Sequence, residues 1–209
     1  MFAGYGLLYG AGNKKDPYGI AIKIKHTGSY EGQTIYTVYT HLAKTLVKVG
    51  DAVEAGQVIG TVGLTGNTSG PHLHYEVRIL TDEGQFNQNP ELWLTPPLEH
   101  GILAGRIINQ AGYPLNGWKF ILTSLESGRD WVISTYDPDV LTYHSHDPYY
   151  QENVVVGGLP EGLYEINIPY GALNRIVTVQ VLPGQVTFFN FYGFDGYEFG
   201  GPVKPTPTP

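Results

Sequence analysis

Two histidines, His72 and His74, lie in the stretch GNTSGPHLHYEVR at residues 66–78 and are separated by one leucine. Residues two positions apart leave the same face of a β-strand, so a strand here would present both imidazoles together. A catalytic zinc site typically has three protein ligands and keeps one position for water. The pair therefore indicates either part of such a site or two polar side chains on a solvated strand.

Short strands separated by glycine-rich turns would have to position this pair. The segments YGIAIKIKHT (18–27), TIYTVYTHL (34–42) and PHLHYEVRIL (71–80) have the β-branched and aromatic content of strands. Regular alternation along the second of them places four side chains on one face, namely Ile35, Thr37, Tyr39 and His41. A short helix is expected around residues 89–94, with Asn89 as its cap and Pro90 at its first position.

The composition predicts an all-β chain with hydrophobic cores. The 209 residues are 42% hydrophobic and 15% charged, and they include 28 Gly, 15 Pro and 16 Tyr. The net charge of -7, without a basic patch, argues against nucleic acid as the main partner. No apolar run reaches the ~20 residues of a membrane span, and the absence of cysteine excludes a disulfide framework.

The first half of the chain resembles the lysostaphin-type zinc endopeptidases. The matching stretches are YGIAIKIKH (18–26), YTHL (39–42), VKVGDAVEAGQVIGTVGLTGNTSGPHLHYEV (47–77) and the dipeptide NP (89–90). The glycines, turn residues and histidines follow the order and approximate spacing of that family, which is far more specific than the His-x-His pair alone. The resemblance implies an antiparallel β-sheet domain that cleaves peptide bonds in bacterial peptidoglycan with a Zn²⁺ cofactor.

The resemblance also implies roles for three histidines. His74 corresponds to a zinc ligand, His72 to a catalytic imidazole beside the metal, and His41 to the companion of His72. Peptidoglycan peptides are then the expected partner, and the expected location is extracellular or in the cell envelope. A secretion signal would lie upstream of Met1, since the first residues do not have the pattern of a signal peptide.

The remaining zinc ligands of the family have no counterpart in this sequence. The family takes them from an upstream His-x-x-x-Asp motif, and no histidine here is followed by aspartate at the fourth position. Asp16 and His26 could be considered as substitute zinc ligands, but their loop and strand positions do not match the ligand positions of the family. Three explanations stay open: an N-terminally truncated and inactive fragment of a longer enzyme, a degenerate module that binds peptidoglycan or a partner cell-wall hydrolase, or ligands from another chain. The abrupt N-terminus favours the first.

A proline-rich junction, TPPLEH at residues 95–100, predicts a domain boundary. We expect a peptidase-like domain at residues 1–98, a β-sandwich at 99–194 and a Pro/Thr-rich tail or linker at 195–209. GRIINQAGYPLNGWKFIL (105–122) and GGLPEGLYEINI (157–168) resemble extracellular sandwiches of the carboxypeptidase-regulatory or Cna-B type. That resemblance implies a spacer or adhesion module.

Three other patterns could carry function but favour simpler interpretations. A second His-x-His, His144 and His146 followed by Asp147, lies in a stretch with the composition of a solvated loop. GDAVEAGQVIG resembles the hairpins of biotinyl and lipoyl carriers, but its turn at residues 54–56 lacks the lysine that those carriers modify. A set of aromatic residues could form a glycan platform, although core packing is the default interpretation: Trp118, Trp131, Tyr143, Tyr149 and Tyr150.

Overall fold

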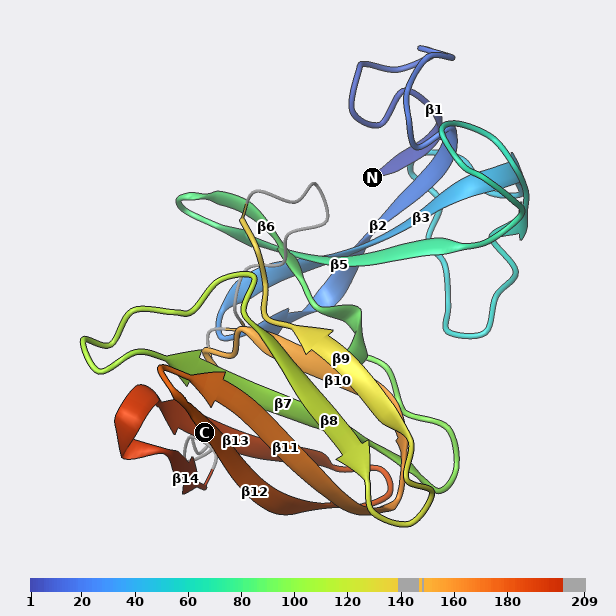
Figure 1. Ribbon diagram of the computed structural model, residues 1–209. Helices are drawn as coiled ribbons and strands as arrows, with labels where there is room; N and C mark the ends of the chain where they lie inside the picture. The colour runs from blue at the N-terminus through green and yellow to red at the C-terminus, as the bar shows by residue number, and fades with distance from the viewer. Residues whose placement is uncertain (139–146, 148, 201–209) are drawn as a thin grey trace. The chain divides into compact units, whose positions relative to one another are not determined.

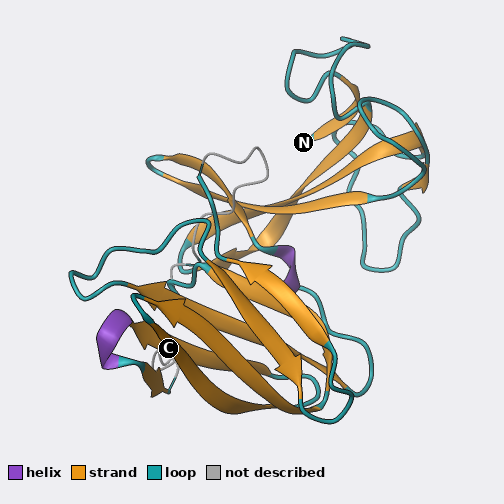
Figure 2. Ribbon diagram, viewed as in Figure 1, coloured by secondary structure: helices purple, strands orange, loops and turns teal. Residues whose placement is uncertain are grey.

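The computed structural model describes residues 1–138, 147 and 149–200. Within these ranges the chain contains fourteen β-strands and two short 3-10 helices, which confirms the all-β prediction (Figure 2). The chain divides into two compact units, Met1–Gln88 and Asn89–Pro209, and each is described by itself. We call them unit 1 and unit 2. No helix in the described ranges is long and apolar enough to cross a membrane.

Unit 1 is built on one antiparallel sheet in the order β1-β2-β3-β5-β6, with β4 paired to β3 (Figure 1). The strands are β1 (Phe2–Tyr5), β2 (Ile20–Tyr30), β3 (Gln33–Thr45), β4 (Gly60–Val62), β5 (His74–Thr81) and β6 (Gly84–Gln88). The three strands expected from the sequence correspond to β2, β3 and β5, with shifted ends.

The two faces of this sheet differ in chemistry. On one face Ile22, Leu42 and Val47 form a small buried cluster, against which Tyr39 also packs. Side chains opposite each other in paired strands lie on the same face, so the pairs Lys23–Val38 and Val38–Glu76 define the other face. That second face is polar, and the histidines are found beside it.

Unit 2 contains two four-stranded sheets, β10-β7-β13-β14 and β12-β11-β8-β9. Their strands are β7 (His100–Ile108), β8 (Lys119–Ser124), β9 (Asp130–Ser134), β10 (Val154–Pro160), β11 (Gly162–Tyr170), β12 (Leu173–Val181), β13 (Val186–Tyr192) and β14 (Tyr197–Phe199). β7 and β13 are parallel, and the other pairs in unit 2 are antiparallel. A 3-10 helix, η2 (Gly193–Asp195), joins β13 to β14.

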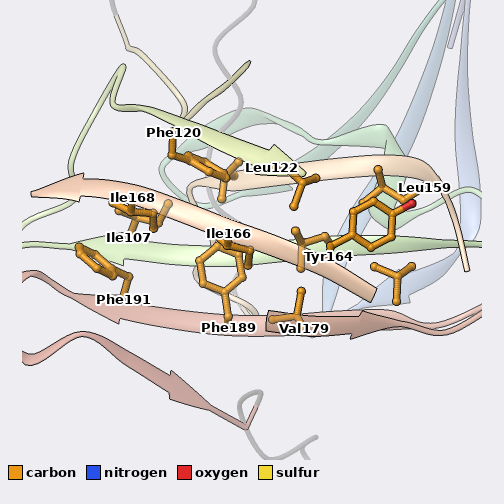
Figure 3. Close-up of a cluster of buried hydrophobic side chains, with 13 residues drawn as sticks. Ile107, Phe120, Leu122, Leu159, Tyr164, Ile166, Ile168, Val179, Phe189 and Phe191 are labelled. Atoms are coloured by element: carbon orange, nitrogen blue, oxygen red, sulfur yellow. The ribbon is translucent and has the colours of Figure 1, made fainter. Parts of the chain in front are cut away.

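The core of unit 2 lies between its two sheets. Phe120 and Ile166 from one sheet and Phe189 from the other belong to a single cluster of thirteen buried residues. Figure 3 shows these side chains meeting between the strands. Alternation of apolar and polar residues along β8 and β11 produces this arrangement, because every second side chain points into the core.

The helix expected near residue 89 is a single 3-10 turn, η1 (Pro90–Leu92). The side chain of Asn89 accepts a hydrogen bond from the backbone N–H of Glu91, and Pro90 occupies the first position. The predicted cap and the predicted proline position are therefore confirmed. The helix is shorter than the expected range, since it ends at Leu92.

Candidate functional site

A β-bulge in β3 determines where His41 lies. Tyr39 is paired with Ile22 of β2 and Leu42 with Ile20, so two residues of β3 oppose one residue of β2. His41 is one of the two, and its backbone is left-handed with φ of 57°. Such a bulge locally breaks the alternation of side chains. Leu42 consequently shares the apolar face with Tyr39.

The expectation that His41 lies on the same face as Tyr39 is therefore wrong. Thr40 is paired with His74 of β5, and Tyr39 with Tyr75, so His74 lies on the face opposite Tyr39. The His41 ring lies next to His74, with 5.7 Å between ring centroids. The extra residue of the bulge thus turns His41 toward the face that carries His74.

His41 is also in contact with the first histidine of the pair. The ring centroids of His41 and His72 are 4.9 Å apart. His72 precedes β5 and forms an isolated bridge with Gly63. The structure therefore brings together all three histidines singled out from the sequence, with the ring of buried His41 next to each of the other two.

Backbone carbonyls determine which ring nitrogen carries the proton in His41 and His72. Nδ1 of His41 lies 2.8 Å from the carbonyl oxygen of Thr65, and Nδ1 of His72 lies 2.9 Å from that of Gly70. A carbonyl oxygen can only accept, so Nδ1 is the donor in both rings. In the neutral state Nε2 of each ring then has a free lone pair, which is the form required of a general base.

Thr65 anchors the loop that holds His41. Its hydroxyl donates to the carbonyl oxygen of Leu42 and accepts from the N–H of Ile20, so the loop is tied to both β2 and β3. The loop also passes very close to Gly19, where an added Cβ would lie 2.3 Å from the carbonyl carbon of Thr65. A glycine is required there for the loop to reach His41.

His74 is held by a polar network that the sequence analysis missed. Its Nε2 lies 2.8 Å from Oε1 of Glu76, and Glu76 is bound in turn by Tyr18 and Arg78. Burial alone would raise the pKa of Glu76, but the hydrogen bonds from His74 and Tyr18 and the charge of Arg78 lower it to about 2. The available signal was the alternation of His72 and His74, which continues to Glu76 and Arg78 on the same face.

The described residues fit one ligand of a zinc site but not a complete set. His74 has a carboxylate on one ring nitrogen, as metal-binding histidines commonly do. Within residues 1–138, 147 and 149–200, however, no group of three His, Cys, Asp or Glu side chains is placed to hold a metal ion. No reaction step is therefore assigned to a metal in this chain.

The two substitutes weighed from the sequence are occupied elsewhere. The carboxylate of buried Asp16 accepts hydrogen bonds from the backbone N–H groups of Leu8, Tyr9 and Tyr18, and so holds its own loop. His26 bonds the hydroxyl of Thr37. Thr37 is paired with Ile24 and lies on the apolar face, opposite His74.

The second His-x-His pair and the aromatic set were the other candidate sites in the sequence. His144, His146 and Tyr143 lie outside the described residues. Trp118 and Trp131 pack against the core of unit 2, where their rings contact Tyr170 and Tyr164 respectively. The two tryptophans therefore follow the core-packing interpretation.

Comparison with known proteins agrees with this geometry. Residues 3–90 match the sequence model of peptidase family M23. We call residues 3–90, which carry this match, the M23 segment. The match confirms the resemblance to lysostaphin-type peptidases drawn from YTHL and HLH, and it contains all three histidines. The resemblance proposed for unit 2 stays a prediction.

The M23 segment is similar to several curated proteins. "Peptidoglycan DD-endopeptidase ShyC" of Vibrio cholerae is 49% identical over 55 residues, which cover 26% of this chain and 12% of ShyC. "DD-carboxypeptidase/endopeptidase Mpg" of Neisseria gonorrhoeae is 46% identical over 66 residues, 32% of this chain and 14% of Mpg. "Peptidoglycan DD-endopeptidase ShyA" of Vibrio cholerae is 48% identical over 65 residues, 31% of this chain and 14% of ShyA. The chain thus spans about a seventh or less of each relative.

Proposed function

We propose that the M23 segment forms part of the active site of a metalloendopeptidase that cleaves peptide bonds in bacterial peptidoglycan. The observation that carries this proposal is the grouping of His41, His72 and His74, produced by the bulge in β3 within the family-matched segment. The names of the relatives support peptidoglycan peptides as the substrate.

In this proposal one imidazole binds the metal and the other two act on the substrate. His74 is the metal ligand, because a carboxylate occupies its Nε2 and leaves Nδ1 free. His72 is the acid–base residue, because it is exposed and its Nε2 lone pair is free. His41 is buried beside it and serves as its companion, stabilising charge near the reacting peptide. A bound zinc ion would supply a water of lowered pKa.

Residues 1–209 by themselves are expected to be inactive. One imidazole is too few for a catalytic zinc site, which typically has three protein ligands, and the described residues provide no group of three. Two further ligands, of the His and Asp types, would have to be supplied. The same observation supports the alternative function, a non-catalytic module that binds peptidoglycan or a partner cell-wall hydrolase.

Unit 2 serves in this proposal as an accessory module. Its two sheets enclose an apolar core, and Trp118 and Trp131 pack against that core, which suits a spacer or adhesion role. An extracellular or cell-envelope location follows from the proposed substrate.

A fusion protein tests the enzyme proposal. The part of ShyA that precedes its matched segment would be joined to residues 3–209 of this chain, loaded with zinc and incubated with cross-linked muropeptides. We expect cleavage by the fusion and none by residues 1–209. The His72→Ala and His74→Ala fusions serve as controls and should both be inactive, with zinc lost only in His74→Ala.

The outcomes separate the two functions. A folded, zinc-loaded fusion that leaves muropeptides intact, while residues 1–209 bind to purified cell walls, would replace the enzyme with the binding module. Metal-dependent cleavage by residues 1–209 would contradict the statement that this chain lacks ligands.

A further inference from the structure

The carboxylate of Glu76 lies at the centre of a closed network on the polar face of unit 1. Its Oε1 accepts from the hydroxyl of Tyr18 at 2.5 Å and is 2.8 Å from Nε2 of His74. Its Oε2 is bound by Nε and Nη2 of Arg78, at 2.6 and 2.5 Å. Four polar atoms of neighbouring side chains thus surround one carboxylate, two at each oxygen.

The residues of this network come from two separate parts of unit 1. Glu76 and Arg78 are on β5, while Tyr18 lies two residues before β2 and 58 residues from Glu76 in sequence. Nη2 of Arg78 also donates to the Tyr18 hydroxyl oxygen at 3.0 Å, which closes the ring of contacts. The side chains of Glu76 and Arg78 are only 10% and 11% exposed, so little water competes with these bonds.

This arrangement dictates the protonation of His74. The Tyr18 hydroxyl proton is directed to Glu76, because Arg78 donates to the same hydroxyl oxygen. Glu76 is ion-paired with Arg78 through Oε2, and a carboxylate in such a pair accepts, so the hydrogen between Glu76 and His74 belongs to Nε2 of His74. Nδ1 of His74 then has the lone pair. His41 and His72 have the opposite tautomer, with the hydrogen on Nδ1.

We propose that Glu76 is a positioning residue for His74, that Tyr18 and Arg78 hold Glu76 in place, and that together they fix His74 as the Nε2–H tautomer. In the site, the lone pair is then on Nδ1 in His74 and on Nε2 in His41 and His72. As a statement about metal binding this inference rests on the proposed function, because it assigns the free Nδ1 of His74 to the ligand position. The tautomer itself depends only on the network.

Long-range ¹H–¹⁵N correlation spectra of residues 1–209 at about pH 8.5, where imidazoles are neutral, test the inference without metal or substrate. We expect Nε2–H for His74, and Nδ1–H for His41 and His72. A hydrogen bond to a charged acceptor should favour the first tautomer by roughly tenfold or more. Glu76→Ala should abolish that preference at His74 and leave the tautomers of His41 and His72 unchanged.

Two tyrosine variants provide a matched comparison if Glu76→Ala does not fold. Tyr18→Phe removes one donor to Glu76, and the tautomer preference of His74 should fall by about threefold. Tyr75→Phe removes a hydroxyl from the other face of β5, where Tyr75 contacts Tyr39, and should change nothing.

Nδ1–H at His74 in the wild-type protein, or an unchanged preference in folded Glu76→Ala or Tyr18→Phe, would overturn the inference. A fusion that fails to cleave while these tautomers are as expected would count against the proposed function alone.

Discussion

The two units have the same kind of secondary structure but differ in what they bury. Unit 2 encloses a cluster of thirteen buried apolar residues between two sheets, whereas the apolar cluster of unit 1 contains three buried residues. Both units also bury polar side chains, but those of unit 1 include His41 and Glu76, which lie among the three candidate histidines. Apolar burial stabilises a fold without specifying chemistry, while buried polar groups require partners and fix one another's geometry.

The comparison indicates how stability and chemistry are distributed between the units. In unit 1, hydrogen bonds to carbonyls and to one carboxylate orient three imidazoles. In unit 2, large aromatic and aliphatic side chains fill a core. Substitutions in unit 2 should therefore act through stability, and substitutions on the polar face of unit 1 should act through geometry.

Phe189→Ala should have the largest effect on stability. Phe189 is fully buried in the core of unit 2, and truncation of such a residue typically costs about 3–5 kcal/mol. Urea denaturation followed by hydrogen exchange in β7 and β11 measures the loss. Val132→Ala is the control, since Val132 is 71% exposed and its truncation should cost less than about 0.5 kcal/mol. Equal effects of the two substitutions would contradict the role assigned to this core.

Glu152 should make the stability of unit 2 depend on pH. Its side chain is fully buried, and burial, with the nearby charge of Asp147, raises its pKa from 4.5 to about 7 despite hydrogen bonds to the carboxylate. The folded state therefore holds the proton more tightly than the unfolded state. Protonated Glu152 therefore contributes about 3 kcal/mol to the free energy of unfolding relative to its ionised form. This contribution is fully present below pH 4.5 and is lost as the pH rises through about 7.

Glu152→Gln should remove this dependence. The glutamine keeps an acceptor for the N–H of Asp147 but has no charge to bury. Unfolding free energies of the two proteins, compared from pH 4 to pH 9, should draw apart between about pH 4.5 and 7, where the wild type loses stability, and differ by a constant amount above that range. Parallel curves would refute the shifted pKa.

Gly19→Ala should destabilise unit 1 locally, with the effect centred on His41. Gly19 has φ of 64°, and a Cβ there would lie 2.3 Å from the backbone of Thr65, whose carbonyl oxygen accepts from His41. Gly32 has φ of 75° with no atom within 4 Å of an added Cβ, so Gly32→Ala carries only the left-handed strain of roughly 1–2 kcal/mol. Gly19→Ala should cost about 1–2 kcal/mol more than Gly32→Ala.

Thermal unfolding and the Nδ1–H signal of His41 distinguish the two glycine variants. We expect the signal to be lost in Gly19→Ala and retained in Gly32→Ala. Retention in both would mean that the loop does not depend on this close approach.

Local patterns were sufficient to predict much of the fold. Alternating β-branched and aromatic residues predicted β2, β3 and β5 in outline, and Asn89 with Pro90 predicted the start of η1. The three histidines were singled out through the resemblance of YTHL, HLH and their surrounding segments to lysostaphin-type endopeptidases. These signals depend on residues that are neighbours in sequence, which is why one chain alone reveals them.

The parts that sequence reasoning missed depend on pairing between distant strands. The bulge at His41 arises from the register of β2 against β3, and no local residue in THL requires a left-handed backbone. The network around Glu76 needs Tyr18, which only the folded sheet brings to β5. Alternation alone therefore placed His41 on the wrong face and did not identify the residues that hold His74.

The most direct test of the central claim concerns His41, because only the bulge brings it to the other two histidines. The cleavage rate of a cross-linked muropeptide would be measured for the zinc-loaded fusion and for its His41→Ala variant. If His41 acts with His72, kcat should fall by about 10²–10⁴-fold while the zinc content stays the same. Equal rates in two folded, equally loaded proteins would contradict the proposed active site.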